Sequence, residues 1–151
     1  MIAMAGYSGT PLAQKLGLKD GQAVGFVDLP ADLSALAKAR DFGRVEAASH
    51  WSALGGTRFD VIHMFAALAR DVEEALPVLR DRIMPDGMIW MSWPKKASKV
   101  PTDVTEDVIR KRALRDVLVD VKVCAVNDVW SGLKLVVRKE LRDQHKNFVK
   151  G

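Results

Sequence analysis

The sequence predicts a three-layer, Rossmann-like α/β domain whose mainly parallel sheet ends in an antiparallel β-hairpin. Two observations predict this class: apolar strand segments alternate with helical segments along most of the chain, and two strand segments follow each other directly near its end. Alternation favours right-handed crossovers and a parallel sheet, whereas consecutive strands favour a hairpin. The 151 residues have a one-domain length, so we expect one domain over 1–151 with a short polar tail from about 141.

Strand and helix segments alternate through the first half of the chain. Apolar and β-branched runs predict strands, and apolar residues at helical spacing predict helices. The predicted strands are 22–28, 44–48 and 60–65, and the predicted helices are 33–40 and 68–83. A short helix precedes them, in which Thr10 caps the free amides, Pro11 takes the first position and Gly17 ends the helix.

The second half predicts a turn, a buried strand, a helix and a hairpin. The predicted segments are the turn 85–87, the strand 88–93, a helix reaching about Leu114, and hairpin strands over 119–126 and 133–138. The strand 88–93 is almost continuously apolar, as expected for a strand covered on both faces. Thr102 or Asp103 is expected to cap the helix. The terminal strand would either pair between subunits in a homo-oligomer or be protected by Arg138 and Lys139.

Composition indicates a folded, soluble protein. The hydrophobic fraction is 48% and the charged fraction 28%, which excludes disorder for the whole chain. One cysteine, Cys124, cannot form an internal disulfide and fits a reducing compartment. The sequence lacks a basic, apolar leader and any run of about 18 apolar residues, so we expect a cytoplasmic protein without a membrane partner.

The basic surplus lies in the C-terminal part. Residues 1–89 carry 9 Lys and Arg against 11 Asp and Glu, whereas residues 90–151 carry 14 against 8. This charge is spread over a helix, a sheet face and a tail, which is typical of a solvated surface. It is not interleaved with exposed aromatic residues or a recognisable module, so nucleic acid is not the expected partner.

The candidate site is the rim where the strands end. Ligands of open α/β sheets bind outside the carboxyl ends of the strands, and the apolar strand 88–93 stops abruptly at Pro94, Lys95 and Lys96. The predicted ligand-binding residues are Asp28, Ser92, Trp93, Lys95, Lys96, Trp130 and Ser131. The two lysines could bind a phosphate or carboxylate or simply be solvated, and the two tryptophans could stack on a planar ligand or pack in the core.

The sequence offers no catalytic constellation. Ser92 and Ser131 lack a nucleophile-elbow motif, so a hydrogen-bonding role is favoured for both. His63 lies inside an apolar strand, where a satisfied core histidine is favoured over a general base. The histidines and Cys124 do not have zinc-ligand spacing, so no metal site is predicted. Residues 7–10 could fold across the rim and contribute backbone amides.

Three stretches of the sequence carry a family resemblance. AGYSGTPLAQKLGLKDGQAV, PDGMIWMSWPKKAS and LVDVKVCAVNDVWSGLKLVVRK resemble an uncharacterised bacterial family known as a domain of unknown function. More distantly, the order of elements and the closing hairpin resemble the S-adenosylmethionine-dependent methyltransferase fold. This resemblance implies S-adenosylmethionine as a possible cofactor, and Glu46 as an acceptor for hydrogen bonds from its ribose.

The first turn departs from the methyltransferase pattern. A glycine-rich turn is expected after the first strand, because close backbone approach to the cofactor leaves no room for side chains. Here residues 28–32 contain no glycine, and Pro30 has no amide donor. The main hypothesis is therefore a non-catalytic binding or regulatory module that holds an anionic small molecule or a protein partner at the rim. The alternative is an S-adenosylmethionine-dependent methyltransferase of unknown acceptor.

Overall fold

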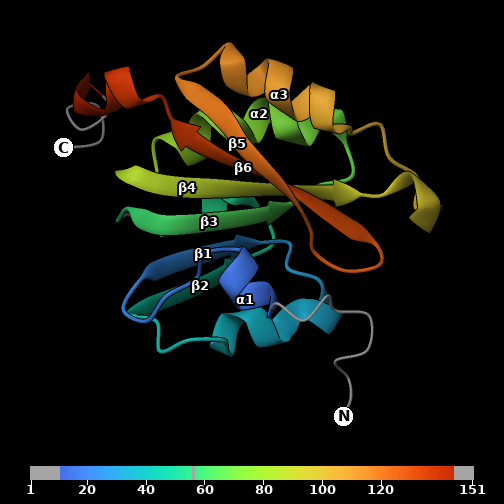
Figure 1. Cartoon of the computed structure of the whole chain (residues 1–151), viewed down its shortest axis with the longest axis horizontal. Coiled ribbons are helices and arrows are strands. Elements are labelled where there is room, and N and C mark those ends of the chain that lie inside the picture. Colours follow the sequence, from blue (N-terminus) through green and yellow to red (C-terminus); the bar gives the residue numbers. More distant parts are fainter. Residues whose placement is uncertain (1–10, 56, 145–151) are drawn as a thin grey trace.

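The computed structural model describes residues 11–55 and 57–144 and contains one six-stranded mixed sheet (Figure 1). The strands are β1 (Ala23–Val27), β2 (Arg44–Ala48), β3 (Phe59–Phe65), β4 (Ile83–Pro94), β5 (Leu118–Ala125) and β6 (Trp130–Val137). Their order is β2-β1-β3-β4-β6-β5, with the first four parallel and β6 antiparallel to both of its neighbours. The predicted Rossmann-like sheet with a C-terminal hairpin is confirmed.

Helices cover the two faces of the sheet. The helical elements are α1 (Leu12–Lys15), α2 (Ala69–Arg80), α3 (Glu106–Leu114), and the 3₁₀ helices η1 (Ala31–Lys38), η2 (Trp51–Ala53), η3 (Lys96–Ser98) and η4 (Lys139–Leu141). In Figure 1, α2 and α3 gather beside β5 and β6, whereas α1 and η1 lie next to β1 and β2. No helix within 11–55 and 57–144 is long and apolar enough to cross a membrane.

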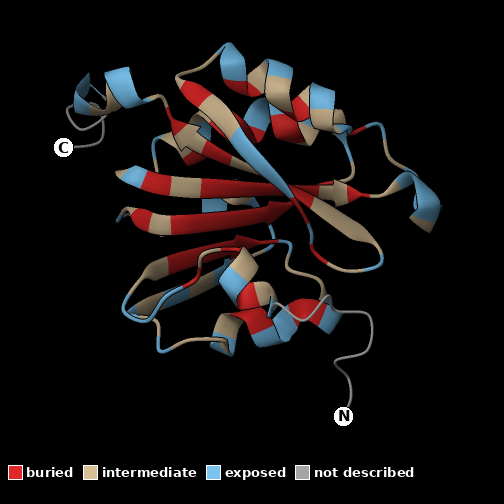
Figure 2. Ribbon diagram, in the orientation of Figure 1, coloured by how far each residue is buried: buried red, intermediate tan, exposed pale blue. Residues whose placement is uncertain are grey.

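Alternating side chains of β3 and β4 divide the core into two parts. Ile62 and Met91 belong to the larger part, which contains the apolar faces of α2 and α3. Trp90 belongs to the smaller part under α1 and η1, and its indole N–H donates to the carbonyl of Leu16 at 2.9 Å. This bond satisfies a buried donor and holds α1 against the sheet. Figure 2 shows that β3 and β4 are mostly buried, as predicted for the strand 88–93.

The boundary between α2 and β4 differs from the prediction. The helix ends at Arg80 rather than at Ile83, and Ile83 is already the first residue of β4. The predicted turn 85–87 is a bulge inside β4, because Phe59 pairs with Ile83 while Val61 pairs with Met88. Apolar residues at helical spacing continue across this boundary in the sequence, so periodicity alone extends the helix too far.

Pro77 lies inside α2 and is accommodated by a side chain from α3. Proline has no N–H to donate to the carbonyl of Glu73, four residues earlier. Arg112 Nε donates to that carbonyl at 3.1 Å and also lies 2.6 Å from the Glu73 carboxylate. Because Pro77 leaves the Glu73 carbonyl without its helical donor, this carbonyl can accept from Arg112 and so connects α2 to α3.

Three further features differ from the prediction: the type of one helix, the cap of another and the place of the terminal strand. The predicted helix 33–40 is the 3₁₀ helix η1. The cap of α3 is Thr105, whose hydroxyl accepts from the N–H of Val108 at 3.2 Å, and not Thr102 or Asp103. The terminal strand β6 lies between β4 and β5, so the open edges belong to β2 and β5. Strand order cannot be read from the sequence of a hairpin, because either of its strands can pair with the sheet.

Several predictions concern the ends of the chain. Gly17 has φ +74° and ends α1, as predicted, with the N–H of Leu18 bonding the carbonyl of Ala13 at 3.0 Å. Pro11 is not the first residue of α1, contrary to the prediction, but the residue before it, because its ψ of 141° is not helical. The cap at Thr10, the segment 7–10 and most of the polar tail lie outside the described residues.

Gly87 is required by the bulge in β4. A Cβ at this position would lie 3.0 Å from the carbonyl oxygen of Asp60 and 3.1 Å from that of Met84. Because both contacts are to backbone, Gly87→Ala should lower the free energy of unfolding by about 1–3 kcal/mol. Urea unfolding measures this, with the exposed neighbour Asp86→Ala as the control, expected within about 0.5 kcal/mol of wild type. Equal stability of the two variants would contradict the assigned bulge.

Candidate functional site

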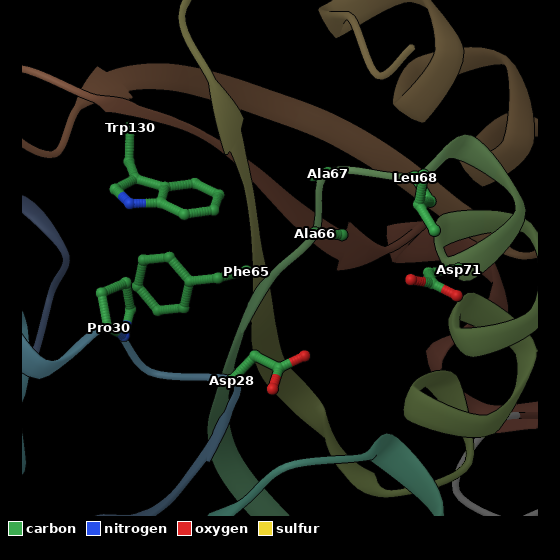
Figure 3. Close-up of a pocket in the computed structure, with 8 residues that line it drawn as sticks. All are labelled: Asp28, Pro30, Phe65, Ala66, Ala67, Leu68, Asp71 and Trp130. Carbon is green, nitrogen blue, oxygen red and sulfur yellow. The ribbon is translucent and has the colours of Figure 1, made fainter. Parts of the chain in front are cut away.

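A cavity lies at the carboxyl ends of β1 and β3, where successive connections run to opposite sides of β1. β1 pairs with β2 on one side and with β3 on the other, so the loops that follow β1 and β3 diverge. The cavity between these loops has a volume of about 460 Å³. Its lining residues are Asp28, Pro30, Phe65, Ala66, Ala67, Leu68, Asp71 and Trp130 (Figure 3). This is the topological switch point at which open α/β sheets bind ligands.

One wall of the cavity is acidic. Asp28 follows β1 directly, and Asp71 comes from the first turn of α2; Figure 3 shows both carboxylates at the cavity. Partial burial and the nearby charge of Asp71 raise the pKa of Asp28, and His50 acts in the opposite direction. The two carboxylates therefore repel each other, and a positively charged ligand between them would relieve this repulsion.

The backbone of Asp28 has an unusual conformation. Its φ is +58°, in the left-handed region that glycine adopts freely and that aspartate tolerates better than most residues. Its N–H donates to the carbonyl of Ala48 at 2.8 Å, which continues the pairing of β1 with β2 by one residue. The turn after β1 therefore bends as a glycine turn would, although residues 28–32 contain no glycine.

The opposite wall is aromatic. Phe65 and Trp130 meet edge to face, with ring centroids 5.2 Å apart. Asn127 fixes the hairpin turn before Trp130, because its side-chain oxygen accepts from the N–H of Val129 at 2.9 Å and from that of Trp130 at 2.8 Å. A planar group can pack against such a pair, since each ring offers apolar surface.

A buried polar pair supports the aromatic wall. His63 and Ser92 are 1% and 0% exposed, and His63 Nε2 lies 2.7 Å from the Ser92 hydroxyl. Burial lowers the pKa of His63 to about 3, so the ring is neutral at pH 7. The same ring stacks on Phe65 at 4.2 Å. His63 is thus the satisfied core histidine that the sequence favours.

The loop between β3 and α2 is held by the segment before α3. The Thr102 hydroxyl donates to the carbonyl of Ala67 at 2.7 Å. The Asp103 carboxylate accepts from the N–H of Ala69, the first residue of α2, at 2.6 Å. These two residues therefore stabilise the cavity wall formed by Ala66, Ala67 and Leu68, a role that their position before α3 does not suggest.

The structure separates the predicted ligand-binding residues. Asp28 and Trp130 line the cavity. Trp93 packs into the larger core, opposite Ser131 in the β4–β6 register, so its side chain lies on the other face from Trp130. Ser92 is fully buried against His63.

Two further groups of predicted residues lie outside the cavity. Lys95 is half-buried at the end of β4, and Lys96 is exposed in η3. Glu46 sits in the middle of β2, where its carboxylate accepts from the N–H of Gly55 at 2.6 Å and lies 3.4 Å from Arg44 Nε. It is therefore engaged within the protein rather than presented at the rim.

Asp71 is a cavity residue that no sequence motif marks. It lies in the first turn of α2, where an acidic side chain is common because it complements the helix dipole. Only the strand order brings it close to Asp28. Knowledge of the order β2-β1-β3 would have shown that the loop after β3 borders the cavity together with the loop after β1. Local periodicity in the sequence does not predict strand order.

The lining of the cavity defines what it can bind. Among the residues that the structure describes, it contains two carboxylates, two aromatic rings and no lysine, arginine or histidine. Such a lining suits a cationic organic molecule that carries hydroxyl donors and a planar ring. Within 11–55 and 57–144, no three His, Cys, Asp or Glu residues are grouped to hold a metal ion.

The fold was compared with known proteins. No protein-family model matches the sequence, and no curated protein matches it. Magnesium protoporphyrin IX methyltransferase from Synechocystis, solved with bound SAH, is similar over 78% of this chain and 74% of its own, with TM-score 0.57 and 12% identity. The N-methyltransferase NodS from Bradyrhizobium japonicum is similar over 78% and 87%, with TM-score 0.54 and 14% identity.

A third similar structure is the m1A22 tRNA methyltransferase of B. subtilis, over 88% of this chain and 65% of its own, with TM-score 0.59 and 10% identity. At these identities the likeness establishes the fold alone. The chain has the Rossmann-like fold of S-adenosylmethionine-dependent methyltransferases, as the resemblance in element order predicts.

The buried neutral state of His63 predicts a pH-dependent stability. The folded protein holds His63 with a pKa of about 3, whereas the unfolded chain takes up a proton below about pH 6.5. The stabilisation from the neutral ring is thus complete above pH 6.5 and is lost as the pH falls towards 3. Urea unfolding at pH 7 and pH 5 should show wild type losing about 2 kcal/mol more than His63→Gln over this interval. Parallel losses in both proteins would contradict a buried neutral His63.

Proposed function

We propose that the protein binds S-adenosylmethionine in the cavity between β1 and β3 and transfers its methyl group to an acceptor. The observation that carries the proposal is the lining of this cavity: two carboxylates face two aromatic rings at the switch point of the sheet. The fold is one that methyltransferases share. The combination of fold, position and lining supports the cofactor better than an anionic ligand.

The cofactor and the cavity match in charge. S-adenosylmethionine carries a sulfonium, an ammonium group and one carboxylate, so its net charge is positive, and Asp28 and Asp71 supply negative charge for its two cationic groups. Its ribose hydroxyls need acceptors, which the same carboxylates offer, and its adenine can pack on Trp130 or Phe65. The cavity volume of about 460 Å³ lies within the range of about 300–1,000 Å³ typical of ligand pockets.

The turn after β1 leaves room for the cofactor but offers it fewer backbone hydrogen-bond donors. The left-handed conformation of Asp28 gives the backbone the bend that a glycine would give. Pro30 lines the cavity but has no N–H, so this turn offers fewer backbone donors than a glycine-rich turn. Binding therefore depends more on the side chains of Asp28 and Asp71 than on backbone amides.

The chain and the cofactor have separate tasks in this proposal. When bound, the cofactor supplies an electrophilic methyl group. Asp28 and Asp71 hold its positive charge, Phe65 and Trp130 exclude water from one side, and Asn127 keeps Trp130 in place.

A non-catalytic module that holds the same cofactor is the second candidate. Asp28 and Asp71 are the only titratable residues that line the cavity among those described, so the lining offers no histidine or lysine as a general base. A methyl acceptor that is already nucleophilic does not need one. Once cofactor binding has been established, methyl transfer to candidate acceptors can be measured. Transfer indicates a methyltransferase, and its absence with all acceptors indicates a non-catalytic module.

Binding can be tested by isothermal titration with S-adenosylmethionine and then S-adenosylhomocysteine. We expect saturable one-site binding, because the cavity is preformed. Asp28→Asn keeps the size and the tolerance for positive φ but removes the charge, and should weaken S-adenosylmethionine binding by about tenfold or more. Asp86→Asn, an exposed change in the β4 bulge, is the control and should bind as wild type does. No heat with either molecule at millimolar concentration would refute the proposed cofactor.

A further inference from the structure

Five lysines gather on the sheet face that carries α1. They are Lys15 in α1, Lys19 after it, Lys95 after β4, Lys122 in β5 and Lys134 in β6, and we call this surface the lysine face. We propose that the lysine face binds the phosphodiester backbone of a nucleic acid. This inference goes beyond the proposed cofactor site, because none of these lysines lines the cavity.

The strand register places the central lysines side by side. Lys134 pairs with Trp90 of β4 on one side and with Lys122 of β5 on the other. Directly opposed residues point to the same face of a sheet, so both lysines share the face of Trp90. Trp90 is the residue whose indole bonds to Leu16, next to Lys15. The register and this bond together bring the end of α1 to the two lysines.

The pKa shifts of two groups in the β5–β6 hairpin agree with the arrangement that the register gives. Burial lowers the pKa of Lys134, and Lys122 and Lys19 lower it further. Burial raises the pKa of the Cys124 thiol, while Lys15, Lys122 and Lys95 act against this rise. Lys15, Lys19, Lys95 and Lys122 therefore each act on Lys134 or on Cys124, two neighbouring groups of the β5–β6 hairpin.

The lysine face carries positive charge without compensation. None of its five lysines forms an ion pair with an acidic side chain in the described part of the chain, where arginines supply the cation of every ion pair. Like charges opposed across two strands, as in Lys122 and Lys134, destabilise a sheet. A polyanion bound across the pair would remove this repulsion.

The face is open to a large ligand. Lys19 and Lys122 are exposed, and the other three are half-buried, which allows their ammonium groups to reach solvent along their apolar stems. α2 and α3 cover the opposite face of the sheet, and Figure 2 shows an exposed stretch of β5 with no helix in front of it.

The composition of the face favours nucleic acid over a protein partner. Protein interfaces are depleted in lysine and are centred on apolar or aromatic residues. The described part of the lysine face is not centred on an apolar patch, because Trp90 is fully buried under α1 and the half-buried Trp130 lines the cavity. The lysine ammonium group interacts with phosphate as a point charge and does not distinguish base sequences. We therefore expect similar binding to RNA and DNA duplexes, with an affinity that falls steeply as salt rises.

The test measures anisotropy of fluorescein-labelled RNA and DNA duplexes of the same sequence. Wild type should lose about tenfold or more in affinity between about 50 and 200 mM salt. Lys122→Ala with Lys134→Ala should weaken binding at low salt by about tenfold and reduce the salt slope by about 2. Lys111→Ala with Lys139→Ala removes the same charge from α3 and η4, and should stay within about twofold of wild type.

Two further measurements separate binding at the lysine face from a folding defect and from the cofactor cavity. Lys19→Ala with Lys95→Ala changes positions outside the strands, so it reports on the face even if the β5–β6 variant does not fold. Titration with S-adenosylhomocysteine separates this surface from the cofactor cavity, because both lysine variants should keep wild-type cofactor affinity. Undetectable duplex binding at low salt, equal losses in the face and control variants, or polyglutamate competing as well as either duplex would overturn the proposal.

Discussion

The sharing of β1 between β2 and β3 is the constraint on which the site depends. Because β1 pairs in parallel with both neighbours, the chain must leave β1 towards β2 and return past it to β3. The loops that follow β1 and β3 consequently separate, and side chains from each face the space between them. Asp28, Asp71 and the β3–α2 loop occupy the rim of this space, and the antiparallel β6 adds Trp130 from the other direction.

Acidic and basic side chains gather on different surfaces of the molecule, which the net charge of +4 does not show. Carboxylates line the cavity, whereas lysines without acidic partners collect on the α1 side of the β5–β6 hairpin. A cationic cofactor and a polyanion would therefore be attracted to different surfaces of the same domain. The β5–β6 hairpin connects them, since it carries both Trp130 and the Lys122–Lys134 pair.

Local sequence signals predict the elements but not their neighbours. The strand 44–48, the buried strand within β4 and the stop at Gly17 follow from patterns of a few residues. The bulge at 84–87 does not, because it depends on pairing with β3. Thr102 and Asp103 look like helix caps and do act as hydrogen-bonding groups, but their partners are Ala67 and Ala69, over 30 residues away.

The candidate site was predictable in its location and only partly in its residues. Asp28 directly follows β1 and Trp130 begins β6, so both line the cavity, and their binding of a ligand stays a prediction. Trp93 and Trp130 lie on opposite faces because the β4–β6 register opposes Trp93 to Ser131, one residue away from Trp130. A shift of one residue reverses the face of a side chain, and the register of an antiparallel pair is not encoded locally. Asp71 required the strand order, which sequence periodicity does not contain.

A ¹H–¹⁵N correlation spectrum of the labelled protein, recorded during titration with S-adenosylhomocysteine, tests directly whether the cavity between β1 and β3 holds the cofactor. We expect chemical-shift changes at the backbone amides of Asp28, Ala67 and Leu68 and at the indole N–H of Trp130, which all belong to the cavity lining. Unchanged spectra, or changes confined to Trp93, Lys95 and Lys96 on the other parts of the rim, would contradict a cofactor site between β1 and β3.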